Sequence, residues 1–362
     1  LMRRNPRVDW AALDDVIYGC ANQAGEDNRD VARMAALLAG LPVSVPGVTL
    51  NRLCASGADA VGAAARAIKT GEAELTIAGG VESMTRAPLV MAKATSAFQR
   101  GAQIEDTVVG WRFVNPIMKS LYGAASMPET GENVADRYKV SREDQDRFGL
   151  WSQEKAAAAK AFHADEIVPV EAKDAKGKPF VFETDEYPRE TSLELLAKLK
   201  PVVRADGTVT AGNASGINDG ACAMFIASKD AAVAQGLTPR AKILGFASAG
   251  VEPDIMGVGP IYSTRKLLDR LKLTMADFDV IEFSEAFASQ VIASTRVLGV
   301  DPFDDRINPH GGGIALGHPL GMTGARLSMT AAHAMEATDG RLALITMCVG
   351  VGQGVSIVIE RV

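Results

Sequence analysis

Two stretches with the same layout determine the fold that we expect for this chain. The first, VTLNRLCASGADAV, covers residues 48–61, and the second, INPHGGGIALGHPLGMTGARLSMTAA, covers residues 307–332. In each, a loop with a reactive side chain leads into a helix of small residues, and a strand ending in glycines follows, at residues 74–80 and 341–354. Strands that alternate with helices predict an α/β fold, and the repeated layout predicts two similar halves.

Apolar runs and Ala-rich stretches extend this pattern along the chain. Apolar runs of strand length predict strands at residues 48–53, 75–79, 241–249, 280–283, 342–347 and 354–359. The last two predicted strands form a near-hairpin around a glycine-rich turn. Ala-rich stretches predict helices at residues 57–70, 142–162 and 324–337, and the stretch STRKLLDRL predicts a further helix at residues 263–271. Strands in such an arrangement are largely buried.

The composition changes in the middle of the chain, where the polar segment KDAKGK at residues 173–178 predicts a solvated loop. We therefore predict an inserted loop domain at residues 87–218. An N-terminal half then consists of residues 1–86, completed by residues 219–239, and a C-terminal half of residues 240–362. The first half has no counterpart of the strand at 241–249, and the chain opens at Leu1 without Met. We expect the missing strand and helix to precede Leu1.

Composition and charge exclude several classes of protein. Lysine and arginine number 38 against 44 acidic residues, so the net charge of −6 does not favour a nucleic-acid scaffold. No run approaches the ~18 apolar residues of a membrane span. Four cysteines in 362 residues do not form a disulfide framework, which predicts a reducing, cytoplasmic setting.

Three residues at glycine-rich junctions are candidates for chemistry. Cys54 lies where a strand meets a helix N-terminus, whose positive end favours the nucleophilic thiolate, although a buried structural cysteine fits this position equally well. His318 lies among five nearby glycines and could act as a base. Cys348 ends an apolar strand and opens the turn CVGVGQG. A strand rather than a helix follows that turn, which argues against a dinucleotide-binding loop.

The remaining cysteines and histidines fit structural roles. Cys20 and Cys222 lie in apolar stretches and are predicted to be buried. We predict a capping or surface position for His163 and a packing or surface position for His333, whereas His310 could be structural or could face the site. No spacing typical of a zinc site occurs, so no metal is predicted.

At these residues the sequence resembles the thiolase family over essentially the whole chain. The matching motifs are NRLCASG at residues 51–57, NPHGG through GHPLG at residues 308–321, and CVGVG at residues 348–352. AGNASG at residues 211–216 is similar to the coenzyme A loop of the family. Within the family, residues 110–116, 126–130 and 346–354 are most similar to the 3-oxoadipyl-CoA (beta-ketoadipyl-CoA) thiolases of aromatic catabolism.

The resemblance implies a five-layered αβαβα core of two similar halves, with a loop domain inserted in the first. It implies ping-pong cleavage of a 3-oxoacyl-CoA by coenzyme A, which is a co-substrate, with no permanently bound cofactor. Cys54 would accept the acyl group, His318 would take the Cys54 proton, and Cys348 would move the proton at the substrate α-carbon. A homodimer or homotetramer is also implied, in which residues 107–127 could supply a packing surface.

The resemblance also implies supporting residues. Coenzyme A would be contacted by Ser215, Arg189 and Met127, all before or within the coenzyme A loop. Ser284 and Gly350 would support an oxyanion hole. However, the family usually has Asn-Glu-Ala-Phe where this chain has SEAF at residues 284–287. The Asn holds a water beside the histidine, and a shorter serine could hold water differently or weaken the hole.

Several alternatives remain open at this point. The chain could be an acetoacetyl-CoA or broad 3-ketoacyl-CoA thiolase, which differs from a 3-oxoadipyl-CoA thiolase in its preferred acyl chain. A ketoacyl synthase pairs its cysteine with two histidines, and the Cys348-x-Gly-x-Gly motif argues against that class. A catalytically impaired coenzyme A-binding or lipid-carrier relative is supported only by Ser284.

Overall fold

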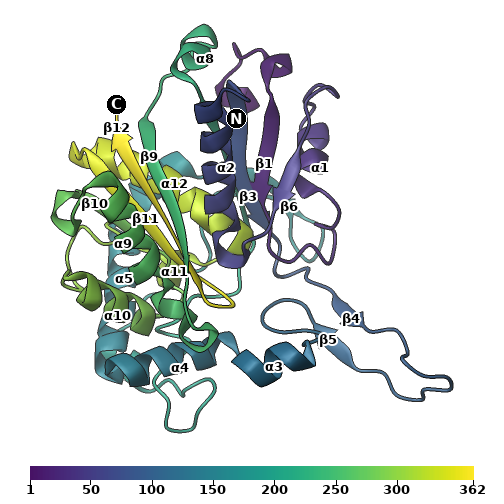
Figure 1. Cartoon of the computed structure of the whole chain (residues 1–362), viewed down its shortest axis with the longest axis vertical. Coiled ribbons are helices and arrows are strands. Elements are labelled where there is room, and N and C mark those ends of the chain that lie inside the picture. Colours follow the sequence, from purple (N-terminus) through teal and green to yellow (C-terminus); the bar gives the residue numbers. More distant parts are fainter.

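Two four-stranded sheets form the centre of the molecule (Figure 1). The computed structural model describes residues 1–362. The first sheet has the order β2-β1-β3-β8, and the second has the order β10-β11-β12-β9. Their strands are β1 (Asp15–Gly19), β2 (Val48–Leu50), β3 (Leu75–Glu82), β8 (Gly220–Ala227), β9 (Ala241–Gly250), β10 (Val280–Phe283), β11 (Leu342–Val349) and β12 (Gln353–Arg361). In both sheets a parallel pair is followed by an antiparallel neighbour, β8 beside β3 and β12 beside β11, so the two halves share a three-strand arrangement. The fourth strand differs: β2 pairs with β1 in the first sheet, and β9 pairs with β12 in the second.

Helices fill three layers around the sheets. These helices are α1 (Val31–Leu38), α2 (Ser56–Thr70), α8 (Lys229–Ala234), α9 (Gly259–Leu271), α10 (Ala288–Leu298), α11 (Gly313–Leu316) and α12 (Leu320–Thr338). Helices α2 and α12 lie between the sheets, where a core of small side chains joins Ala58 and Ala325 to Ile17 of one sheet and Met347 of the other. Helices α9 and α10 cover the outer face of the second sheet, and α1 covers the first. The predicted αβαβα fold is therefore confirmed.

The chain leaves the first sheet after β3 and returns to it in β8, which pairs with β3 in antiparallel register. Between them lie α3 (Pro116–Tyr122), α4 (Met127–Tyr138), α5 (Arg142–Ala158), α6 (Lys160–Glu166), α7 (Leu193–Ala197) and the hairpins β4 (Leu89–Met91) with β5 (Ile104–Asp106) and β6 (Val170–Lys173) with β7 (Pro179–Phe182). The predicted KDAKGK loop forms the turn between β6 and β7. The exact domain boundaries remain our proposal.

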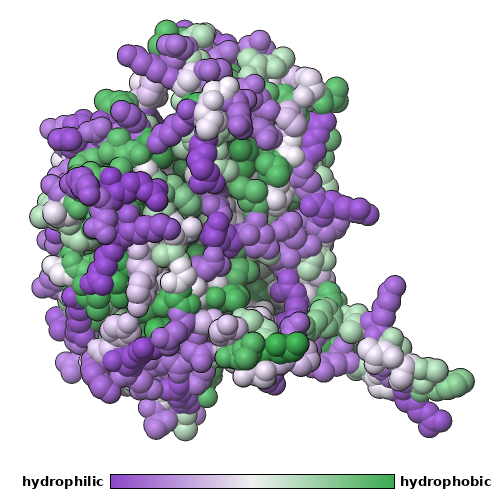
Figure 2. Space-filling model, in the orientation of Figure 1, coloured by the Kyte–Doolittle hydropathy of each residue, from purple (hydrophilic) through white to green (hydrophobic).

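The β4–β5 hairpin and α3 project from the body as an arm with exposed apolar side chains. Phe98 is 97% exposed, Leu89 is 67% exposed, and Ile117 and Leu121 on α3 are 69% and 66% exposed. Figure 2 shows hydrophobic residues gathered over α3 and along part of this arm. No helix in the structure is long and apolar enough to cross a membrane.

Most predicted elements are present, and the differences have local causes. The predicted strand at 48–53 ends at Leu50, because Leu53 adopts a positive φ of 49° and starts the 3₁₀ turn η3 (Leu53–Ala55). The predicted helix at 142–162 breaks at Ala159, where α5 ends and α6 begins. Strands β1 and β8 were not predicted, because β1 has only five residues and β8, GACAMFIA, is rich in small residues.

Four glycines bring the two halves into backbone contact, and we call Gly19, Gly57, Gly80 and Gly321 the glycine junction. They lie at the end of β1, at the start of α2, in β3 and in the first turn of α12. A Cβ on Gly321 would lie 2.6 Å from the Cα atom of Cys20 and 2.7 Å from the carbonyl oxygens of Gly19 and Val81. These neighbouring atoms belong to the backbone and cannot move away as the end of a flexible side chain could. Only glycine therefore fits at position 321.

A buried carboxylate fixes the glycine junction further. Glu82 of β3 accepts hydrogen bonds from the backbone N–H groups of Gly321 at 2.8 Å, Ala21 at 2.9 Å and Asn22 at 3.0 Å. Cys20 and Asp27 approach the same carboxylate. Because three backbone donors already engage its oxygens, Glu82 serves to join β1, β3 and α12.

We predict that Gly321→Ala destabilises the protein by about 1–3 kcal/mol, because the added methyl group overlaps backbone atoms. Helix propensity alone predicts a gain of up to ~1 kcal/mol for this change. Urea unfolding followed by circular dichroism measures the difference. Gly101→Ala is the matched control, since its Cβ meets no atom within 4 Å. An unchanged stability of Gly321→Ala would contradict the tight contact.

Candidate active site

A strained turn positions Cys54 between β2 and α2. Leu53, which has a positive φ, is held from both sides: its N–H donates to Asn51 Oδ1 at 2.8 Å, and its carbonyl accepts from Ser56 Oγ at 2.6 Å. A non-glycine residue adopts this backbone conformation only when its surroundings enforce it. The turn places the side chain of Cys54 in the interior, with 8% of the residue exposed.

The Cys54 thiol is protonated in the resting structure. Burial raises the pKa of Cys54 to about 11, although the N–H of Gly350 donates to its sulfur and opposes the shift. Burial, the largest cause, thus acts against the thiolate that a helix N-terminus is expected to favour. To act as a nucleophile, this thiol needs a base.

Cys348 lies beside Cys54 at the end of β11. The residue is fully buried, and burial together with the neighbouring Cys54 raises the pKa of Cys348 to about 12. The turn after β11 places Gly350 against the Cys54 loop, where a Cβ on Gly350 would lie 3.1 Å from Leu53 Cδ1. The same position lies 4.0 Å from the sulfur of Met127, the first residue of α4. The structure thus brings both thiols, Gly350 and Met127 together.

His318 is held as a neutral imidazole just before α12. Thr323 Oγ1 lies 2.7 Å from His318 Nδ1 and donates its own hydrogen to the carbonyl of Pro319 at 2.8 Å. The Thr323 oxygen must therefore accept the Nδ1–H of His318, which assigns the lone pair to Nε2. Nε2 is buried and has no partner within the chain. Burial, assisted by Arg326, lowers the pKa of His318 to about 4, so the ring is a free base at neutral pH.

The glycine junction holds the loops of His318 and Cys54 close together. Gly57 follows Cys54 by three residues, and Gly321 follows His318 by three residues. A Cβ on Gly57 would lie 2.7 Å from the carbonyl oxygen of Gly321, so the two backbones touch at this point. The first turns of α2 and α12 therefore hold the loops of both candidate residues in the same region.

Ser284 follows β10 and contacts Cys348. Its backbone N–H donates to the carbonyl of Thr346 at 3.1 Å. Its hydroxyl oxygen accepts the N–H of Cys348 at 3.3 Å and lies 3.8 Å from the Cys348 sulfur. The hydroxyl makes no hydrogen bond to His318. Ser284 was predicted to support an oxyanion hole, and the structure places its hydroxyl beside the thiol of Cys348.

The predicted coenzyme A loop is attached to the residues that follow Ser284. Ser215 N–H donates to the carbonyl of Ala286 at 3.0 Å, and Ala214 bridges to Phe287. Arg189 donates to the carbonyl of Ala211 at 3.1 Å in the same loop, and its guanidinium lies over the ring of Tyr187. Ser215 therefore lies near the thiols, whereas Arg189 lies at the exposed edge of the loop.

A buried polar network that the sequence did not reveal supports the glycine-rich loop before His318. Glu285 accepts hydrogen bonds from Ser152 Oγ at 2.7 Å, Asn308 Nδ2 at 2.6 Å and the N–H of Ile314 at 3.1 Å. Burial raises the pKa of Glu285, and these donors oppose the shift. The signal for Glu285 in the sequence was an acidic residue two positions after an apolar strand. Thr323, which orients His318, had no comparable signal.

The other three histidines lie outside this site. His310 stacks on Phe162 with ring centroids 3.6 Å apart, and His333 stacks on the other side at 4.1 Å. His163 is buried and donates from Nε2 to the carbonyl of His310 at 2.8 Å, so its predicted capping or surface position is wrong. His310 is structural, and His333 packs as predicted.

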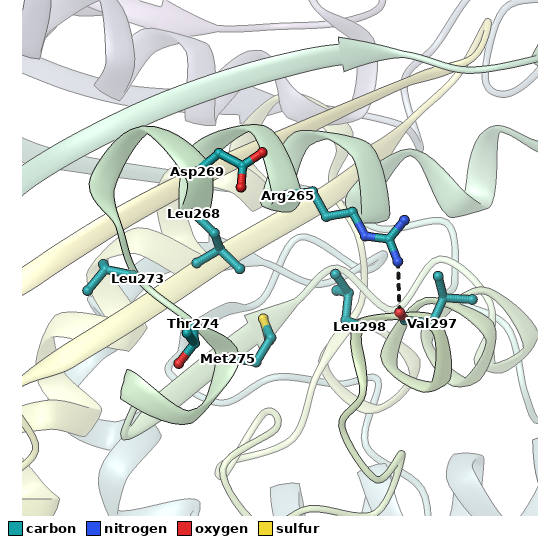
Figure 3. A pocket seen from close by; sticks show the side chains of 8 residues that line it. All are labelled: Arg265, Leu268, Asp269, Leu273, Thr274, Met275, Val297 and Leu298. Carbon is teal, nitrogen blue, oxygen red and sulfur yellow. Dashed lines mark hydrogen bonds between the residues drawn. The ribbon is translucent and has the colours of Figure 1, made fainter.

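A hollow on the outer surface is separate from the candidate site. It has a volume of about 300 Å³ and lies between α9, α10 and the turn η5 (Met275–Asp277), as Figure 3 shows. Leu268 and Leu298 line it, and Arg265 donates to the carbonyl of Val297 at 3.0 Å across its edge. None of the predicted site residues borders this hollow.

Comparisons with known proteins agree on one family. The model of the thiolase N-terminal domain matches residues 1–230, and that of the C-terminal domain matches residues 237–361. The chain is 64% identical to a beta-ketoadipyl-CoA thiolase of Pseudomonas knackmussii over 365 residues, covering 100% of this chain and 91% of the relative. It is 59% identical to a 3-oxoadipyl-CoA/3-oxo-5,6-dehydrosuberyl-CoA thiolase of Escherichia coli K12, with the same coverage. The crystal structure of the Bacillus anthracis acetyl-CoA acetyltransferase superimposes with a TM-score of 0.91 at 38% identity, covering 100% and 90% of the two chains.

We predict that His318 stays neutral far below the ordinary histidine pKa, because its charged form would be buried without a partner. Histidine-labelled protein has only four ring signals, so NMR can follow each of them. The His318 signal should stay constant from about pH 8 to pH 5 and report an Nδ1–H tautomer. The His318→Gln variant assigns the signal. A titration midpoint near ~6.5 would contradict this geometry.

Proposed function

Because the chain belongs to the thiolase family, and is thus an acyltransferase, we propose that it cleaves 3-oxoadipyl-CoA with coenzyme A to succinyl-CoA and acetyl-CoA. The observation that carries this proposal is the pair of buried thiols beside one another in a chain that shares well over half its residues with beta-ketoadipyl-CoA thiolases. Thiolytic cleavage requires one thiol that accepts an acyl group and one group that moves a proton on carbon. The site offers a candidate for each.

In the first half of the reaction, Cys54 attacks the 3-oxo carbon of the substrate while His318 Nε2 takes the thiol proton. The bond between C2 and C3 then breaks, and C2 leaves as the carbanion of acetyl-CoA. Cys348 donates its thiol proton to C2, which leaves a succinyl thioester on Cys54 and a thiolate on Cys348. The raised pKa of Cys348 supports this order, because the thiol holds its proton until a strong carbon base forms.

In the second half, the Cys348 thiolate takes the proton of the incoming coenzyme A thiol. The coenzyme A sulfur attacks the succinyl thioester, and Cys54 leaves and regains its proton from His318. Every proton returns to its starting group, which gives ping-pong kinetics. Both cysteines must stay reduced, and all four cysteines of the chain are free, so we place the enzyme in the reducing cytoplasm.

Supporting residues follow from the contacts around the thiols. We assign to Gly350 a donor role toward the reacting oxygen, since its N–H already points at the Cys54 sulfur. Loss of one such donor costs roughly 10²–10³ in rate. Ser215, Arg189 and Met127 are assigned to coenzyme A, because two of them flank the loop at 211–216 and Met127 lies beside Gly350. Coenzyme A acts only as a co-substrate in this scheme.

We predict that acetyl-CoA alone acylates Cys54, because its own coenzyme A thiolate can leave without proton transfer to carbon. Intact-mass analysis after incubation should show one acetyl adduct on the wild type and none on Cys54→Ala. Cys222→Ala is the matched control: this cysteine lies on β8, and its loss should leave the adduct intact. Binding of coenzyme A without any adduct would favour the impaired, non-catalytic alternative.

We predict a preference for the dicarboxylic substrate over acetoacetyl-CoA of at least about tenfold in kcat/KM, a ratio that a few contacts to the acyl chain can supply. Initial rates of substrate loss at limiting concentration measure it. Equal rates on both substrates would instead support a broad 3-ketoacyl-CoA thiolase. The 38% identity between this chain and an acetyl-CoA acetyltransferase also favours that alternative.

We propose that the chain assembles as a homodimer or homotetramer through its projecting arm. The exposed Phe98 and the apolar side chains of α3 are unusual on a monomer surface and are suited to burial against a second copy. We predict that native mass spectrometry detects such an assembly and that Phe98→Asp with Leu121→Asp lowers its mass. Val233→Asp, at an exposed apolar position on α8, is the control. A wild type that is monomeric at micromolar concentration would refute this role.

A further inference from the structure

Ser284 is the one side chain that can hydrogen-bond the sulfur of Cys348. The thiol is fully buried, and its packing partners Met256, Phe287 and Val209 are apolar. The Ser284 hydroxyl oxygen, 3.8 Å from the sulfur, already accepts the Cys348 N–H. The hydroxyl hydrogen is therefore free to point at the sulfur.

The backbone around Ser284 keeps this contact in place. Ser284 directly follows β10, and its N–H bonds to the carbonyl of Thr346, two residues before Cys348 on the neighbouring strand β11. The residue is 2% exposed, so bulk water does not compete for the hydroxyl. Two hydrogen bonds from one residue thus tie the end of β10 to the end of β11.

We propose that Ser284 is a positioning residue for Cys348, whose hydroxyl orients the thiol and donates a hydrogen bond to the thiolate formed when Cys348 gives up its proton. This inference rests on the proposed function, in which Cys348 alternates between thiol and thiolate. The thiolate forms in an apolar pocket, where an unpartnered charge is costly. A hydrogen bond to a charged group stabilises more than one to a neutral group, so Ser284 acts mainly on the thiolate.

This role differs from the expectation that Ser284 replaces an asparagine that holds water beside His318. No hydrogen bond links Ser284 to His318, whose Nε2 has no partner within the chain. On this proposal Ser284 supports proton transfer on carbon, and the acylation of Cys54 does not require its hydroxyl. The two steps can be measured separately, which makes the proposal testable.

The experiment compares two reactions of acetyl-CoA with the purified full chain. Quenched-flow mass analysis gives the rate at which Cys54 is acetylated, a step without proton transfer to carbon. NMR in D₂O gives the rate at which the methyl hydrogens of acetyl-CoA exchange, a step that needs the Cys348 thiolate. In Ser284→Ala we expect exchange to fall by about ten- to a hundredfold, the range for a hydrogen bond to a charged group, while acetylation stays near the wild-type rate.

The pH profile gives a second readout. Without the Ser284 hydroxyl the Cys348 thiolate is less stable, so the pKa of Cys348 rises. Because burial already raises the pKa of Cys348 to about 12, the exchange rates of the wild type and of Ser284→Ala should both climb with pH, with that of Ser284→Ala lower throughout. Ser284→Thr retains a hydroxyl and should recover most of the exchange.

Controls separate this role from a purely structural one. Ser294→Ala removes a buried hydroxyl on α10 that has no hydrogen-bond partner, and both rates should remain unchanged. Equal losses of acetylation and exchange in Ser284→Ala, or an unchanged exchange rate, would overturn the proposal. If Ser284→Ala does not fold by circular dichroism, Ser284→Cys, with its weaker donor, should show the same selective loss. A wild type that forms no adduct refutes the proposed function itself, which is a distinct outcome.

Discussion

The contact of bare backbones at the glycine junction is the constraint on which the site depends. Gly19, Gly57, Gly80 and Gly321 let β1, β3, α2 and α12 approach more closely than any side chain permits. Helices α2 and α12 come from different halves of the chain, and each begins just after a residue that we assign to catalysis. Because each helix starts at the glycine junction, the contact fixes the positions of the loops that precede α2 and α12. The carboxylate of Glu82 accepts a hydrogen bond from the N–H of Gly321 and holds the contact in place.

Burial sets the electrostatics of this site. Both thiols hold their protons more tightly than free cysteine, and the imidazole holds a proton less tightly than free histidine. Burial thus favours the uncharged form of all three candidate groups. Protonated thiols also react slowly with oxidants, which suits an enzyme whose two cysteines must remain reduced.

The sequence predicted the local elements and the motifs well, because periodicity and turn residues are local properties. Strand β10 was predicted to the residue, and α2 to within one residue. The burial that opposes a thiolate at Cys54 could not be predicted from the sequence, because it depends on distant elements. Asn218, which holds the backbone of His318, lies a hundred residues earlier in the chain, so no spacing in one sequence connects the two. Strand β8 was missed because its partner β3, rather than its own composition, makes it a strand.

The turn between β11 and β12 has a consequence for engineering. Cys348 and Gly350 lie on the same hairpin, so the proposed proton carrier and the amide beside the proposed nucleophile belong to one structural unit. A substitution that shifts this hairpin alters acyl transfer and proton transfer together, and its effects will be strongly non-additive with changes at Cys54 or Ser284.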